Sequence, residues 1–234
     1  MKTAVLLSLL FIGVVFAEPN PDQPAPPIEF VQARVLRNLN LQDFQLEGVM
    51  HTLKKIYPMR LRTRNHEMVY EFTDQPLQIR VILDPSQPSV SRRKNSSSDW
   101  HELTGHARLE TVLDTDVTYE DLCLDFIRWS KVTGLGTDDI KTLKSWAFEA
   151  VPDEVSQYSK VRYWISSDYY AFLRVDGYND RGQAIKRVEV NGIQKIGSAY
   201  VLKEMQVSTL IPGRELSSSR TYIEVRSGKP GSGL

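Results

Sequence analysis

The feature that most constrains the fold is an alternation of apolar and polar residues over the second half of the chain. Segments near 160–166, 170–178, 184–196, 200–210 and 220–226 place an apolar side chain at every second position. Because side chains alternate between the two faces of a strand, this period predicts half-buried strands. Turn residues at 179–182 and 212–213 separate them, so successive strands are expected to pair antiparallel.

The residues that point to one face of these strands are almost all apolar. Those that point to the opposite face include charged residues such as Arg162, Glu189 and Glu224. Opposite charges on neighbouring strands can lie side by side on an outward face. We therefore take the apolar parity as the inner face and as the candidate ligand-binding surface. Its members are Val161, Tyr163, Ile165, Leu173, Val175, Val188, Val190, Val201, Met205, Val207 and Ile223.

The rest of the chain predicts further strands and two modest helices. Alternation recurs over residues 44–50, 59–61, 68–72 and 77–83, and strands are expected at 131–140 and 143–151. Apolar spacing predicts a helix over 28–39, and the capping box Thr118-Asp121 predicts a second one over 119–129. The apolar face of that second helix carries Leu122, Phe126 and Trp129. The fold class is therefore mainly β with helices.

The apolar face has two interpretations. Half-buried sheets are common, so the pattern by itself favours a core that the two helices close. About ten strands with two helices leave little helix to cover the face, which favours a sheet that curls around a cavity. Residues 84–103, which include the basic run 92–94, are expected to form an exposed loop because prolines and serines accompany the charges.

The N-terminus predicts export. Lys2 precedes an apolar stretch over 4–16, and the segment ending at Ala17 has the small-residue pattern of a cleavage site. We expect a signal peptide over 1–17, cleaved after Ala17, then a proline-rich extended leader over 18–27, a single β domain over 28–226 and a flexible tail over 227–234. Loss of Lys2 from 29 basic against 29 acidic residues leaves a net charge of about −1, which gives no sign of nucleic-acid binding.

Catalytic and metal-binding patterns are not found in the sequence. It contains no Gly-x-Ser-x-Gly elbow, no phosphate-binding glycine loop and no cysteine-rich metal motif, so no cofactor and no enzyme activity are expected. His101 and His106 match no standard zinc spacing and are interpreted as surface residues. The single cysteine, Cys123, has apolar neighbours and is expected to be buried and inert.

Several short motifs resemble the bacterial outer-membrane lipoprotein-sorting proteins, the LolA-like family. They are Tyr119-Glu120-Asp121-Leu122, Val161-Arg162-Tyr163-Trp164-Ile165, Leu173-Arg174-Val175, Asn179-Asp180-Arg181-Gly182, Lys186-Arg187-Val188-Glu189-Val190 and Ser219-Arg220-Thr221-Tyr222-Ile223-Glu224. Each motif is weakly specific, but their order and spacing together make the resemblance meaningful. It extends from about residue 46 to residue 225.

The resemblance implies an incomplete, curved antiparallel β-barrel whose apolar concave side is covered by a helical lid. It also implies a periplasmic carrier whose ligand is a lipid or an acylated lipoprotein, with membrane components of a lipoprotein transport system as further partners. Leu122, Phe126 and Trp129 would be the lid residues. The alternative is an envelope sensor or interaction module that docks a polypeptide on the same sheet, and a third possibility is an enzyme whose site is assembled from scattered residues.

Overall fold

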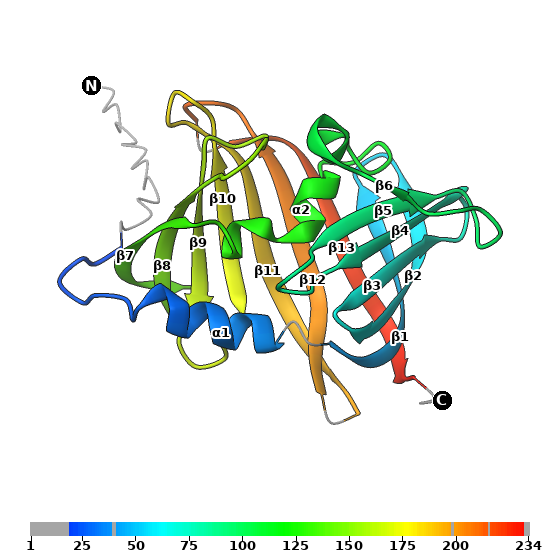
Figure 1. Cartoon of the computed structure of the whole chain (residues 1–234), viewed down its shortest axis with the longest axis horizontal. Coiled ribbons are helices and arrows are strands. Elements are labelled where there is room, and N and C mark those ends of the chain that lie inside the picture. The colour runs from blue at the N-terminus through cyan, green and yellow to red at the C-terminus, as the bar shows by residue number, and fades with distance from the viewer. Residues whose placement is uncertain (1–18, 39–40, 198, 215, 232–234) are drawn as a thin grey trace, which may run out of the picture.

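The protein is described by a computed structural model that covers residues 19–38, 41–197, 199–214 and 216–231. Its centre is a sheet of thirteen strands in the order β6-β5-β4-β3-β2-β1-β13-β12-β11-β10-β9-β8-β7 (Figure 1). The strands are β1 Leu41–Thr52, β2 Ile56–Asn65, β3 Glu67–Phe72, β4 Leu77–Ile82, β5 Ser89–Arg93, β6 His101–Glu102, β7 Lys131–Ile140, β8 Leu143–Val151, β9 Lys160–Ser166, β10 Phe172–Tyr178, β11 Ala184–Ile196, β12 Ala199–Leu210 and β13 Ser217–Pro230.

Every neighbouring pair in this sheet is antiparallel, and most pairs are hairpins between consecutive strands. The exception is the central pairing of β1 with β13, which joins the first half of the chain to its end. Because β6 and β7 lie at opposite edges, the sheet curves without closing. The predicted fold class, a curved antiparallel sheet with helices on its inner side, is confirmed.

The helical segments are α1 Ile28–Asn38, η1 Gly105–Leu109, α2 Tyr119–Cys123 and η2 Asp125–Ile127. Of these, α1 and α2 lie on the inner side of the curve (Figure 1). The helix predicted over 28–39 is therefore confirmed. The helix predicted over 119–129 is shorter than expected, because Leu124 adopts a left-handed conformation (φ 53°) and ends α2 before η2 begins.

Two main buried clusters fill the inner side. The cluster that we call the α2 core contains Met50, Tyr57, Met59, Tyr70, Phe72, Ile79, Val81, Leu83, Val90, Leu103, Val112, Val117, Tyr119, Leu122, Cys123, Val207 and Ile223. The cluster that we call the α1 core contains Val31, Val35, Phe126, Ile127, Trp129, Phe148, Ala150, Val161, Tyr163 and Ile165. A small third cluster of Phe44, Leu46 and Val225 lies on β1 and β13.

Two segments predicted as irregular are strands. Within the expected loop 84–103, β5 pairs with β4 and buries Val90 in the α2 core. The prolines and serines that suggested a loop flank this short strand, whose pairing depends on a neighbour that local composition does not reveal. Similarly, residues 227–230 of the expected tail continue β13, where Gly228 and Pro230 pair with β1.

The expected signal peptide and its cleavage after Ala17 lie outside the described residues. In the leader segment, Asn20 forms an isolated antiparallel bridge with Thr137 of β7. The Asn20 amide donates to the Thr137 carbonyl oxygen at 2.7 Å. A side chain at Gly136 would overlap the Asn20 backbone, so the close approach requires glycine there. The leader therefore follows the edge of the sheet before α1 begins.

Candidate ligand-binding face and its lid

The structure divides the predicted inner face into a buried part and a half-buried part. Six of its eleven residues are buried: Val161, Tyr163, Ile165, Leu173, Val207 and Ile223. The other five are half-buried, and we call them the apolar strip: Val175, Val188, Val190, Val201 and Met205. The strip belongs to β10, β11 and β12, between the central strand β13 and the β7 edge of the sheet.

Strand register makes most of the apolar strip continuous. Val175 pairs with Val188, and Val190 pairs with Met205 on the next strand. Val175 also packs against the α1 core, while Val188 and Met205 pack against the α2 core. These three residues therefore connect the two cores along the inner face, whereas Val201 packs against the third cluster.

One predicted member of the face lies apart from the cores. The register of β9 and β10 shifts between Phe172 and Arg174, so Phe172 pairs directly with Ile165. The Phe172 ring then contacts Phe126 at 5.3 Å and Tyr163 at 6.1 Å between centroids. Leu173 is buried but belongs to none of the three clusters. Strict alternation assigned Leu173 to the inner face. The extra residue of a β-bulge shifts this alternation, and the sequence pattern alone does not reveal it.

The three predicted lid residues are buried and are divided between the cores. Leu122 of α2 belongs to the α2 core, whereas Phe126 of η2 and the nearby Trp129 belong to the α1 core. Segment 110–129 thus crosses the inner side and packs onto both clusters. We call this segment, together with α1, the lid.

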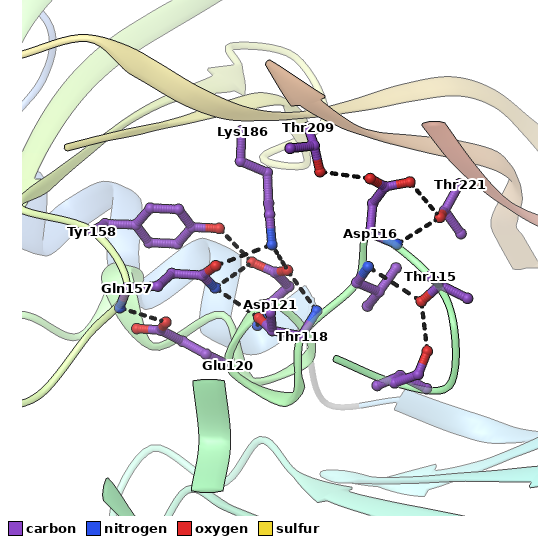
Figure 2. A network of polar contacts seen from close by, with 12 residues as sticks. Thr115, Asp116, Thr118, Glu120, Asp121, Gln157, Tyr158, Lys186, Thr209 and Thr221 are labelled. Carbon is purple, nitrogen blue, oxygen red and sulfur yellow. Dashed lines mark hydrogen bonds and ion pairs between the residues drawn. The ribbon is translucent and has the colours of Figure 1, made fainter. Parts of the chain in front are cut away.

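A buried ionic network attaches α2 to the sheet (Figure 2). The Lys186 ammonium of β11 donates to Asp121 at 2.7 Å and to the Gln157 side-chain oxygen at 3.1 Å. The Tyr158 hydroxyl donates to the other Asp121 oxygen at 2.6 Å. Burial raises the pKa of Tyr158 well above its usual value, and the neighbouring Asp121 charge adds to the shift. Lys186 and Asp121 are therefore a desolvated pair, and loss of either partner leaves a buried charge.

The same Asp121 also holds the start of α2. The Asp121 amide donates to the Thr118 hydroxyl, while the Thr118 amide donates to the Asp121 carboxylate at 2.8 Å. This is the capping box predicted from the sequence, and it is confirmed. One carboxylate thus fixes both the helix start and its position over β11.

A second carboxylate attaches the preceding loop to β12 and β13 (Figure 2). Asp116 accepts hydrogen bonds from Thr209 at 2.5 Å, from Thr221 at 2.8 Å and from Ser219. The Asp116 amide in turn donates to the Thr221 hydroxyl at 2.8 Å. Asp116 is 8% exposed, and its carboxylate is stabilised by hydroxyl donors from two strands.

The other half of the lid, α1, is attached mainly through apolar contacts. Val31 and Val35 are buried in the α1 core. The Gln32 side chain donates to the Ile127 carbonyl oxygen at 2.7 Å, and Asn38 donates to two carbonyl oxygens in the β9–β10 turn. Arg34 stacks on Phe30 and Tyr170. Within the described residues, no ion pair joins α1 to the sheet.

The sequence analysis missed two polar residues of the inner face, Lys186 and Thr209, although the alternation along their strands indicated this position. Lys186 has the same parity as Val188 and Val190, and Thr209 has the same parity as Val207. Their position on the inner face could have been predicted. Their partners Asp116 and Asp121 could not, since they come from a loop and a short helix whose approach to the sheet is set by tertiary packing.

Other candidate groups show structural roles. Cys123 is buried, as predicted, and its burial raises the thiol pKa to about 11. Among the described residues, His, Cys, Asp and Glu form no group of three that could hold a metal ion. The described helices include none with the length and apolar character needed to span a bilayer. Two surface hollows, beside Lys55 and beside Arg62, contain none of the eleven inner-face residues.

Comparison with known proteins supports the fold. A family model described as that of an uncharacterized protein matches residues 95–232. A comparison with curated proteins gives no match.

Three solved structures are similar over most of this chain. One is a domain described as an outer membrane lipoprotein-sorting protein from Vibrio parahaemolyticus, with TM-score 0.71 and 15% identity over 88% of this chain and 93% of that one. Another is a DUF1329 family protein from Desulfovibrio piger, with TM-score 0.67 and 16% identity over 90% and 95%. The third is a LolA superfamily protein from Nitrosomonas europaea, with TM-score 0.62 and 13% identity over 90% and 96%. At these identities the comparisons establish a LolA-like fold.

Proposed function

The chain belongs to the uncharacterized protein family whose model spans residues 95–232, and because its fold is LolA-like, we propose that it is a periplasmic carrier that binds an acyl chain. The ligand would be a lipid or an acylated lipoprotein on its way to the outer membrane. The chain would act by binding and release, without catalytic chemistry and without a cofactor. Membrane components of a lipoprotein transport system would supply and accept the ligand.

The observation that carries this proposal is the apolar strip between the two cores. Its five side chains are only half-buried, although Val175, Val188 and Met205 pack against the two cores on the inner side of the sheet. An alkyl chain placed along them would gain about 0.8 kcal/mol for each buried methylene group. Apolar area of this kind on the inner face of a curved sheet is suited to the tail of a lipid.

Binding would require part of the lid to move. The buried members of the inner face, such as Tyr163 and Ile165, contact lid residues in the structure and are covered by them. Displacement of the lid would add their surface to the strip and lengthen the apolar track. Return of the lid would expel the chain, since lid and ligand would compete for the same surface.

The direct test uses the delipidated mature chain and two probes, a fluorescent fatty acid and a triacylated lipoprotein. Saturable uptake near one equivalent of either probe is expected. Folded protein that binds neither probe would contradict the proposal. Mass spectrometry of the chain purified from its native host separates the alternatives further, because a copurifying polypeptide in place of lipid would favour an interaction module.

Two variants at adjacent positions of β11 test which face of the sheet binds the ligand. Val190→Glu places a charge on the apolar strip and is expected to abolish uptake, because the carboxylate would be buried beside the ligand tail. Glu189→Gln changes the outer face at the neighbouring position and should leave uptake unchanged. Circular dichroism and urea denaturation of both variants confirm that the loss is not one of folding. Equal uptake by the two variants would show that the strip is not the site.

A further inference from the structure

The α1 core contains one polar atom that the fold leaves unsatisfied. Tyr163 of β9 is fully buried on the inner face, and its hydroxyl has no hydrogen-bond partner among the described residues. Buried hydroxyl groups in folded proteins are almost always paired, because desolvation without a partner is unfavourable. The exception at Tyr163 therefore needs an explanation.

Packing of the ring does not explain the hydroxyl. The Tyr163 ring contacts Phe148 at 5.6 Å, Phe126 at 5.2 Å and Phe172 at 6.1 Å between centroids. A phenylalanine at this position would keep all three contacts without burying an oxygen. Burial raises the pKa of the Tyr163 phenol above its usual value, so the group remains a neutral donor.

Part of the packing around Tyr163 comes from the lid. The Phe126 ring of η2 packs on the Tyr163 ring, and Val31 and Val35 of α1 belong to the same buried cluster. On the sheet side, Tyr163 pairs with Val175, the first residue of the apolar strip. Displacement of the lid would leave the hydroxyl at one end of an apolar track.

We propose that the Tyr163 hydroxyl is the polar anchor of the ligand site and donates a hydrogen bond to the carbonyl oxygen of an ester- or amide-linked acyl chain. This inference rests on the proposed function and specifies the ligand chemistry. The donor is neutral, and its surroundings within the α1 core are apolar. A charged carboxylate or phosphate would lose its hydration there, whereas an ester or amide carbonyl needs one donor.

The test compares two pyrene-labelled probes of equal chain length, a fatty acid methyl ester and an alkane without a carbonyl group. Tyr163→Phe is expected to weaken ester binding about tenfold, equivalent to about 1.4 kcal/mol, and to change alkane binding less than twofold. The denaturation midpoint should stay the same or rise, because the substitution removes an unpaired buried hydroxyl. A purely structural role would instead lower the midpoint and weaken both probes.

Tyr70→Phe is the matched control, since Tyr70 is buried in the α2 core and away from the proposed anchor. It should leave the ratio of the two dissociation constants unchanged. An unchanged ester-to-alkane ratio in Tyr163→Phe would overturn the inference while leaving acyl-chain binding intact. Failure of the wild-type chain to bind either probe would overturn the proposed function and, with it, the anchor.

Discussion

The two cores on the inner face are covered in different ways. The cover of the α2 core is attached to three strands by buried carboxylates, with Asp121 paired to Lys186 and Asp116 held by hydroxyl groups. The cover of the α1 core includes Phe126 and Trp129 from the same segment, but its other part, α1, is attached by two buried valines, a few neutral hydrogen bonds and the stacking of Arg34 on Tyr170. Separating a buried charge from its oppositely charged partner costs far more free energy than separating two apolar surfaces. A ligand can cover those apolar surfaces again. Under the proposed function, α1 is therefore the part of the lid that would exchange places with an acyl chain.

The largest expected effect comes from breaking the ionic attachment of α2. Lys186→Met should lower the free energy of unfolding by about 3–5 kcal/mol, because Asp121 would keep a buried charge without its cation. Urea denaturation measures the loss. Adding Asp121→Asn should recover part of it, since the second substitution removes the unpaired charge.

The control for that variant is Lys203→Met on an exposed position of β12, which should change stability little. A loss below about 1 kcal/mol in Lys186→Met would mean that the buried pair does not fix α2. The contrast between the two halves of the lid would then disappear.

A smaller effect is expected from loosening α1. Val35→Ala removes two buried methyl groups from the α1 core and should cost about 2 kcal/mol, including the cavity left behind. Hydrogen exchange should accelerate in α1 while amides of β3 and β4 keep their protection. Arg37→Ala, on the exposed side of the same helix, is the control. Equal acceleration in both cores would show that the lid opens as one unit.

The smallest expected change concerns Cys123, which reports on the α2 half. With a thiol pKa of about 11, only about one molecule in a thousand carries the thiolate at pH 8, and burial restricts access further. Alkylation by iodoacetamide, followed by mass spectrometry, should be negligible over hours and unchanged by an acyl ligand. Chain unfolded in urea should react readily. Ligand-dependent alkylation of the folded chain would place the opening at α2 instead of α1.

Local patterns predicted most of the strands, because the alternation of apolar and polar residues that marks a strand extends over only a few neighbouring positions. Alternation over β9, β11 and β12 identified the inner face, and the Thr118-Asp121 pair identified the start of α2. The strand β5 was missed, since five residues between prolines and serines carry little periodicity. The early end of α2 at Leu124 was also missed, because the apolar spacing of a continuous helix persists through that residue.

For the candidate site, the sequence likewise predicted which residues lie on the inner face, with exceptions. Parity correctly placed residues such as Val188 and Val207 on one face, because strand geometry fixes this alternation. It failed at Leu173, where a register shift turns Phe172 inward. No local pattern indicated that the Tyr163 hydroxyl lacks a partner, since that depends on residues brought together from β8, β10, η2 and α1.

By itself, the sequence determined a chain rich in antiparallel strands, one apolar face and a capped helix beside it, since each follows from spacing over a few residues. Only the tertiary structure decided how that face is covered. Pairing of β1 with β13 brings the two halves of the chain together, and segment 110–129 crosses the curve to reach Lys186 and Thr221. Contacts between residues far apart in the chain depend on the complete fold, so the difference between the ionic attachment of α2 and the mainly apolar attachment of α1 emerges only there.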